Sequence, residues 1–214
     1  MPIRNWKYIE EYLDRLAGEV YAEPITKNHR AITRKAFNRY VLPNKGQFRL
    51  ALDIGCGQAV ALELFRAQGI PVIGITLGEE DARVCRQRGF DVRIGDQSFL
   101  DFPDAHFDLV WSRHCLEHSP MPLLTLFEYN RVLRDGGFLY IEVPQADSVH
   151  IENPNHYSLF ADRGWRNLFK RAKFQITGYN VWTLSYRWPS GVVMDDYYYA
   201  YWLNKIESIR QGTK

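Results

Sequence analysis

The chain has 214 residues, of which 46% are hydrophobic and 24% charged, and its formal net charge is +2. This composition is typical of a globular domain, and so small a charge gives no reason by itself to expect a polyanionic partner. Three scattered cysteines without a CxxC pair argue against a disulfide framework and favour a cytoplasmic protein with reduced thiols. The sequence shows no secretory signal and no apolar run of about 20 residues, so we expect no membrane span.

The N-terminal part of the chain is predicted to be helical. Apolar residues at helical spacing predict an amphipathic helix over 5–21, and a second helix is expected over 28–41. We expect residues 1–46 to form a helical cap on a main domain of residues 47–214.

The second helix belongs to a basic segment. No acidic residue stands between Glu23 and Asp53. Seven basic residues do: Lys27, Arg30, Arg34, Lys35, Arg39, Lys45 and Arg49. The segment is either a solvated helix face or a basic lip for a phosphorylated or nucleic-acid substrate.

From residue 49 onward, short apolar runs alternate with helical segments. Strands are expected over 50–54, 72–76, 92–94, 109–112, 138–143, 174–181 and 196–203. Helices are expected over 59–68, 79–88, 123–133 and 162–172. This rhythm predicts an α/β fold: a doubly wound, Rossmann-like, mostly parallel seven-stranded sheet with helices on both faces. The last two strands have no helix between them and should form an antiparallel hairpin at the sheet edge.

A glycine turn follows the first of these strands. Residues 49–57 read R-L-A-L-D-I-G-C-G, and a strand, a glycine turn and a helix N-terminus together cradle a polar cofactor at the end of a parallel sheet. A dinucleotide site requires a third glycine and an acidic residue at the end of the second strand. Val60 and Thr76 occupy those positions, so the turn does not fit NAD.

The D-x-G-x-G pattern beginning at Asp53 instead resembles the first motif of class I S-adenosylmethionine-dependent methyltransferases. Further segments resemble that family's motifs in the same order: 72–77, Gly95-Asp96, 107–112, Leu116-Glu117-His118 and the R-V-L-R-D-G-G turn at 131–137. Together these motifs identify the chain as similar to the methyltransferase type 11-like branch of that family.

The resemblance implies S-adenosylmethionine as cofactor and a set of residues around it. These are Asp53, Gly55, Cys56, Gly57, Thr76, Leu77, Glu79, Asp96, Gln97, Ser112 and Arg113. The amides of the two glycines suit the amino-acid end of the cofactor, and Asp53 its ammonium. Asp96 suits the adenine amino group. Most relatives have an acidic residue where Thr76 stands, so either Thr76 or Glu79 is expected at the ribose diol.

Histidines cluster after the strands that should end beside the cofactor. His114 and His118 follow the fourth strand, and His150 and His156 follow the fifth. One hypothesis makes a histidine the general base, with His118 or His156 preferred and His114 as a further candidate. A second hypothesis places His114, Glu117 and His118 on one helical face around a divalent metal, with His150 or Glu152 as a further ligand, although we expect no metal site. In a third, the histidines only hold loops, and catalysis is mainly positioning.

The favoured function is methyl transfer to a small-molecule acceptor, at an oxygen of a glycan, a lipid-linked intermediate or another metabolite. Residues 153–158 are expected to close the acceptor pocket, and Trp165, Trp182, Trp188 and Tyr197 to Tyr199 either stack on an acceptor or pack over the sheet. The alternatives are a nucleic-acid methyltransferase, motivated by the basic segment, and a non-catalytic methyltransferase-like binding module.

Overall fold

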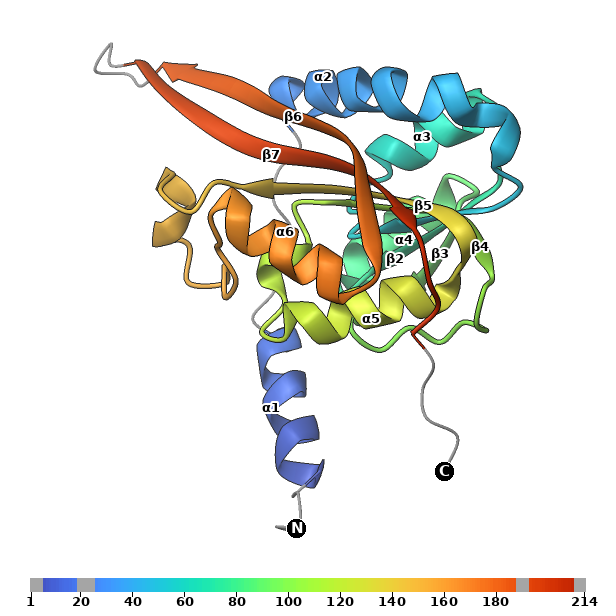
Figure 1. Cartoon of the computed structure of the whole chain (residues 1–214), viewed down its shortest axis with the longest axis horizontal. Coiled ribbons are helices and arrows are strands. Elements are labelled where there is room, and N and C mark those ends of the chain that lie inside the picture. The colour runs from blue at the N-terminus through green and yellow to red at the C-terminus, as the bar shows by residue number, and fades with distance from the viewer. Residues whose placement is uncertain (1–5, 19–25, 188–192, 210–214) are drawn as a thin grey trace.

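The computed structural model of the chain describes residues 6–18, 26–187 and 193–209. The strands are β1 (Ala51–Ile54), β2 (Val72–Thr76), β3 (Asp91–Ile94), β4 (Phe107–Arg113), β5 (Leu133–Pro144), β6 (Phe174–Arg187) and β7 (Val193–Lys205). They form one seven-stranded sheet in the order β3-β2-β1-β4-β5-β7-β6 (Figure 1). The first five strands are parallel, and β7 pairs antiparallel with both β5 and β6. The predicted fold class is confirmed.

The central strands are apolar because both faces of the sheet are covered. All four residues of β1 are buried, as are the first six of β4. Alternation of side chains sends Leu52 and Ile54 to one face and Ala51 and Asp53 to the other. Asp53 therefore lies on the same face of the sheet as Ala51, the face that the helix over residues 60–67 covers.

Helices cover both faces, as Figure 1 shows. The helices are α1 (Trp6–Gly18), α2 (Lys27–Ala36), α3 (Val60–Ala67), α4 (Glu79–Gln87), α5 (Pro122–Val132) and α6 (Asp162–Arg171). Helices α5 and α6 pack on one face, through Tyr129 and Phe169 among others. Helices α2 and α3 pack on the other, where Phe37 and Phe65 contact Trp111 of β4 edge to face. Large buried aromatic side chains therefore fix both layers to the sheet.

Helix α2 continues through a π-helix, Phe37–Val41, into a 3-10 helix, Leu42–Gln47. Buried Phe37, Tyr40 and Val41 join the core that α3 shares with the sheet. The basic side chains of this segment lie on the outer, exposed surface. The expected boundary at residue 46 stays a prediction.

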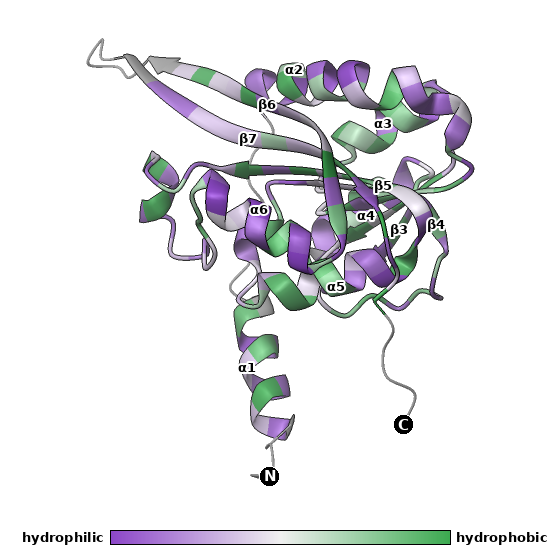
Figure 2. Ribbon diagram, viewed as in Figure 1, coloured by the Kyte–Doolittle hydropathy of each residue, from purple (hydrophilic) through white to green (hydrophobic). Residues whose placement is uncertain are grey.

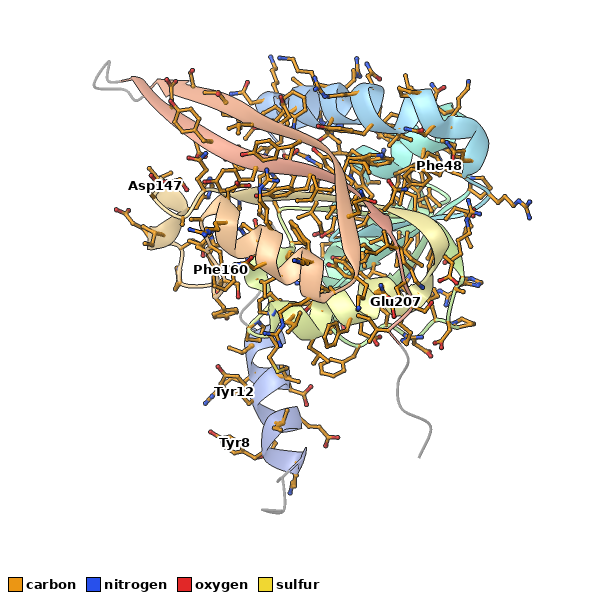
Figure 3. All side chains as sticks on the ribbon, viewed as in Figure 1. Tyr8, Tyr12, Phe48, Asp147, Phe160 and Glu207 are labelled. Atoms are coloured by element: carbon orange, nitrogen blue, oxygen red, sulfur yellow. The ribbon has the colours of Figure 1, made fainter. Side chains whose placement is uncertain are left out.

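Helix α1 extends away from the body of the molecule (Figure 1). Hydrophobic and hydrophilic residues alternate along its ribbon in Figure 2, and its Tyr8 and Tyr12 point outward in Figure 3. None of the described helices combines the length and the apolar character that crossing a membrane requires.

The C-terminal hairpin of β6 and β7 carries much of the aromatic content. Trp202 of β7 stacks on Phe138 and on Tyr40, and the Trp182 indole donates a hydrogen bond to the Tyr140 hydroxyl at 3.2 Å. Trp165 is fully buried in α6. These rings pack over the sheet, whereas Tyr197 is exposed and Trp188 lies outside the described residues.

Candidate active site

A cavity of about 280 Å³ opens at the carboxyl ends of β1, β2 and β4. In open α/β sheets this edge is where ligands bind. Of the eleven residues expected around a cofactor, nine line the cavity: Asp53, Gly55, Cys56, Gly57, Thr76, Leu77, Asp96, Gln97 and Arg113. Glu79 and Ser112 do not line it.

The glycine turn between β1 and α3 is built on left-handed backbone. Gly55 has φ +69° and Gly57 φ +45°, a region that side chains disfavour. The amides of Gly55 and Cys56 both donate to the Ile75 carbonyl, at 2.9 and 3.0 Å. The Gly55 amide is therefore committed to the sheet, contrary to its expected role beside the cofactor. The Gly57 amide makes no hydrogen bond to any described residue.

The two glycines are required for different reasons. A Cβ on Gly55 would lie 2.9 Å from the Cys115 sulfur, whereas a Cβ on Gly57 would meet nothing within 4 Å. Gly55 thus lets β1 approach the loop after β4. Gly57 keeps its backbone open toward solvent and ligand.

Asp53 is an orphaned carboxylate at the end of β1. Its side chain is buried, and its Oδ2 atom has no hydrogen-bond partner among the described residues. Burial raises the pKa of Asp53 well above its usual value, although the Arg113 guanidinium opposes this shift. A cationic ligand in the cavity would supply the missing partner.

The region expected to bind the ribose is arranged differently from the sequence prediction. Glu79 is exposed at the start of α4, whereas Asp81, two residues later, is buried and lines the cavity. The Thr76 hydroxyl accepts a hydrogen bond from the Gly78 amide at 3.2 Å, which holds the turn between β2 and α4. Asp81 is the carboxylate that the sequence reasoning missed.

On the side expected to bind adenine, Asp96 accepts the Ser98 amide at 2.7 Å through one oxygen. Gln97 is fixed from both ends, because its amide donates to the Cys115 carbonyl at 2.7 Å and its carbonyl accepts from the Tyr129 hydroxyl at 2.6 Å. Ser112 is buried beneath this pair and contacts the same Tyr129 hydroxyl at 3.3 Å. Ser112 therefore supports Gln97 from behind the cavity wall.

A buried ion pair follows from the register of β4 and β5. Arg113 and Glu142 are direct neighbours in that ladder, and the guanidinium forms two hydrogen bonds with the carboxylate. Glu142 also accepts from the Tyr140 hydroxyl at 2.6 Å and contacts His114 Nε2 at 3.1 Å. Burial disfavours the charged carboxylate, but Arg113 and His114 hold the pKa of Glu142 well below its usual value.

His114 belongs to this network and not to a helical face with Glu117 and His118. Its φ of +49° precedes a 3-10 helix of only three residues, Leu116–His118. Burial favours the neutral ring, yet the carboxylates of Glu117 and Glu142 raise the pKa of His114 to about 9. The structure therefore does not form the expected i, i+3, i+4 helical arrangement.

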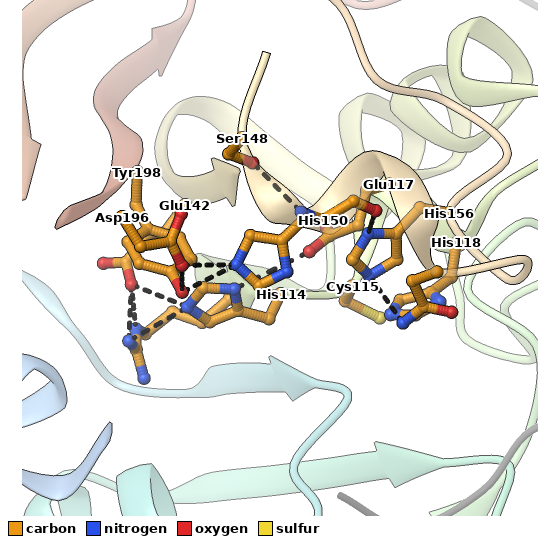
Figure 4. A network of polar contacts seen from close by, with 12 residues as sticks. His114, Cys115, Glu117, His118, Glu142, Ser148, His150, His156, Asp196 and Tyr198 are labelled. Atoms are coloured by element: carbon orange, nitrogen blue, oxygen red, sulfur yellow. Dashed lines mark hydrogen bonds and ion pairs between the residues drawn. The ribbon is translucent and has the colours of Figure 1, made fainter. Parts of the chain in front are cut away.

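His118 and His156 lie side by side although they come from different loops. His118 Nδ1 contacts the carbonyl of Asn155, which comes 37 residues later in the chain. Their ring centroids are 4.7 Å apart in an edge-to-face arrangement, next to Glu117 (Figure 4). His118 lines the cavity, as do the neighbouring Asn155 and Tyr157. The loop expected to close the acceptor pocket thus contributes two residues to its wall.

The His150 ring lies 5.4 Å from the His156 ring, and its Nε2 points toward the C-terminal hairpin. Its Nε2 lies 2.6 Å from Asp196 Oδ2 and 2.8 Å from the Tyr198 hydroxyl (Figure 4). Burial disfavours ionisation of Asp196, but the contact with His150 holds its pKa below the usual value. His150 therefore ties the loop after β5 to β7.

Residues 52–141 match the sequence pattern of the family described as "Methyltransferase domain". The chain is 31% identical, over 75% of its length, to 27-O-demethylrifamycin SV methyltransferase of Amycolatopsis mediterranei. It is 37% identical, over 50% of its length, to sarcosine/dimethylglycine N-methyltransferase of Halorhodospira halochloris. Residues 52–141 therefore form a methyltransferase domain, and the resemblance to class I S-adenosylmethionine-dependent methyltransferases is confirmed.

The chain spans 62% and 47% of the lengths of these two relatives. Among solved structures, a SAM-dependent methyltransferase of Archaeoglobus fulgidus matches with a TM-score of 0.67 at 19% identity, over 82% of this chain and 94% of that one. The [4+2]-cyclase SpnF matches with the same TM-score and identity, over 94% of this chain and 93% of that one. The fold of the methyltransferase domain is thus shared by enzymes of two reaction types.

The methyltransferase domain match ends inside β5, so part of the cavity wall lies outside it. Asn155 and Tyr157 come after residue 141, and Leu13, Leu16, His29 and Thr33 come before residue 52. Helices α1 and α2 supply these last four. Only Leu13 and Leu16 gave a signal in the sequence, as part of the apolar stripe of the first helix.

Proposed function

We propose that the protein transfers the methyl group of S-adenosylmethionine to a small-molecule acceptor, at an oxygen atom. The observation that carries the proposal is the orphaned Asp53 carboxylate, which faces the cavity beside the open backbone of Gly57. The cofactor's amino-acid end carries the ammonium that this carboxylate lacks. When bound, the cofactor supplies an electrophilic methyl group on a sulfonium.

The residues that line the cavity fit such a cofactor. Asp53 and the Gly57 amide are assigned to its ammonium and carboxylate, Asp81 to the ribose diol in place of Glu79, and Asp96 to the adenine amino group. Cys56, Leu77 and Thr76 shape the wall between these groups. Gln97, held at both ends, gives the adenine side a rigid edge.

The chain's own contribution to the reaction is to bind and orient the acceptor and to exclude water. Leu13, Leu16 and Tyr157 contribute apolar surface to the cavity wall. His118 is the ring that we place against the acceptor, with His156 behind it. His114 acts as a positioning residue, because it holds the Arg113–Glu142 pair beneath the site.

A relative named for 27-O-demethylrifamycin SV and several named as ubiquinone biosynthesis O-methyltransferases favour an oxygen acceptor. The exposed basic segment on α2 could instead serve a nucleic acid, but it lies on the outer surface of that helix. The small, partly apolar cavity favours a metabolite.

The proposal is tested in two steps with the full chain. Calorimetry with S-adenosylhomocysteine should show one binding site, which Asp53→Asn weakens and the exposed control Asp91→Asn leaves unchanged. Labelled cofactor is then incubated with a panel of hydroxylated small molecules, amines and RNA. Label on a hydroxyl supports the proposal. Absence of binding, or label on RNA alone, contradicts it.

A further inference from the structure

Glu117 is a buried carboxylate without a hydrogen bond. Its side chain is 0% exposed, and neither oxygen finds a donor among the described residues. The nearest cationic atom is His114 Nδ1 at 3.7 Å, and the other nitrogen of that ring already contacts Glu142. His114 thus supplies one ion-pair contact, while both Glu117 oxygens keep lone pairs that no hydrogen bond occupies.

Two imidazoles next to Glu117 are oriented by backbone carbonyls. His118 Nδ1 lies 2.9 Å from the Asn155 carbonyl, and His156 Nδ1 lies 2.9 Å from the His150 carbonyl. Because a carbonyl only accepts, each Nδ1 carries the proton and each Nε2 keeps a lone pair. Metal-binding histidines show this outer contact, which fixes their tautomer and ring orientation.

The three side chains converge. One donor atom from each of Glu117, His118 and His156 lies within 4.8 Å of the other two. Ligands that bind Zn²⁺ at about 2.0–2.2 Å lie about 3–3.5 Å apart, so side-chain movements on the order of 1 Å would close the site. Among the described residues, the competing contact at His156 Nε2 is a long one of 3.3 Å to the Asn153 amide.

We infer that Glu117, His118 and His156 bind one divalent transition-metal ion at the acceptor side of the cavity. Two neutral imidazoles and one carboxylate are a donor set suited to Zn²⁺ or Fe²⁺, whereas Mg²⁺ and Ca²⁺ prefer oxygen ligands. Three protein ligands leave one coordination position of the metal ion open. Because His118 lines the cavity, this open position lies at the cavity wall.

The open position fits an oxygen of the methyl acceptor, and this part of the inference rests on the proposed function. A metal ion there lowers the pKa of a coordinated hydroxyl group. His114 is not a ligand, because Glu142 and Arg113 hold it on the other side of Glu117. The site therefore joins the 3-10 helix after β4 to the loop after β5.

The inference is tested by titrating the tag-free, metal-stripped full chain with Co²⁺ and following the visible absorption of the ion. One equivalent should produce a saturable spectrum, and Zn²⁺ should displace it. Glu117→Gln and His156→Ala should each weaken binding at least about tenfold, since a direct ligand is lost. The controls Glu79→Gln and His106→Ala alter exposed residues elsewhere and should bind as the wild type does.

Because Glu117 is buried, its variant could fail to fold, and half-buried His156 provides the second test. Circular dichroism and S-adenosylhomocysteine binding are measured on each variant. Retained fold with unchanged Co²⁺ binding in His156→Ala overturns the inference, as does the absence of a saturable spectrum in the wild type. Metal binding without S-adenosylhomocysteine binding would sustain the site and contradict the proposed function.

Discussion

Asp53 is a buried carboxylate whose Oδ2 atom has no hydrogen-bond partner among the described residues. Burial raises its pKa, so the folded chain holds a proton on Asp53 more tightly than the unfolded chain does. The resulting contribution to the free energy of unfolding is present in acid and is lost as the pH rises through the folded-state pKa. A ligand ammonium would reverse this preference by stabilising the ionised form.

We therefore expect Asp53→Asn to make the ligand-free protein more stable than the wild type at about pH 8, with the difference shrinking toward about pH 4. The same variant should bind S-adenosylhomocysteine about tenfold or more weakly, because a charge-assisted hydrogen bond is lost. Urea unfolding at several pH values and calorimetry measure the two effects. Equal pH dependence in both proteins would contradict the burial argument.

Gly55 and Gly69 have the same φ, +69°, but different surroundings, because a Cβ on Gly69 would meet nothing within 4 Å. Gly69→Ala should cost about 1–2 kcal/mol of unfolding free energy from the left-handed backbone alone. Gly55→Ala should cost more, since its methyl group would contact the Cys115 sulfur. Cys115→Ala should remove part of that excess in a double-mutant cycle measured by urea unfolding, because the Cβ of residue 115, at 3.1 Å, stays. Equal costs at both glycines would exclude the steric contribution.

The positions of single residues could be predicted where a local sequence motif determines them. The glycine turn, Asp53 and Asp96 belong to local motifs, and all of them line the cavity. Asp81 was missed because both it and Glu79 lie in the first turn of α4, and only the phase of the packed helix decides which one faces inward. The contact of His118 with His156 depends on a loop that no spacing rule describes.

At the scale of elements, that loop is held to the segment after β4 by two hydrogen bonds from Ser158, in addition to the His118–Asn155 contact. The Ser158 amide donates to the Glu117 carbonyl at 2.9 Å, and the Ser158 hydroxyl donates to the Ser119 carbonyl at 2.7 Å. The bonds bring two segments together that follow different strands of the sheet. Most strands and long helices were predicted within three residues, because their apolar periods are strong, but β5 begins five residues earlier and β6 ends six residues later than expected. The short 3-10 helices have no such apolar period, and they were not predicted.

Helix α1 contributes to the cavity by one face only. Leu13 and Leu16 line it, whereas Tyr12 is exposed on the same helix. We expect Leu16→Ser to raise the acceptor KM severalfold while the thermal midpoint changes little, because α1 lies outside the main core. Tyr12→Ser is the matched control and should leave KM unchanged. Steady-state kinetics with an acceptor identified by the labelled-cofactor screen measure both, and an equal effect of the two variants would refute a role for this face.

On the scale of the whole molecule, the middle of the sheet is the part best protected from hydrogen exchange. β1, β4 and β5 are buried on both faces and have a neighbouring strand on each side. We expect their amides to show the slowest hydrogen exchange, and the far ends of β6 and β7, which extend beyond the sheet in Figure 1, to exchange fast. Exchange followed by mass spectrometry measures this order. Faster exchange in β4 than in the hairpin ends would contradict it.

The place of β7 between β5 and β6 also sets the order in which the chain can fold as it is synthesised. β5 is complete long before its partner β7 appears, and β6, which appears between them, cannot pair with β5 in the native sheet. Until β7 arrives, β5 presents an unpaired edge that includes the apolar residues Tyr140, Ile141 and Val143. Such an edge invites pairing with another nascent chain. A ribosome that pauses before residue 193 would therefore prolong the interval in which this protein is most prone to aggregate.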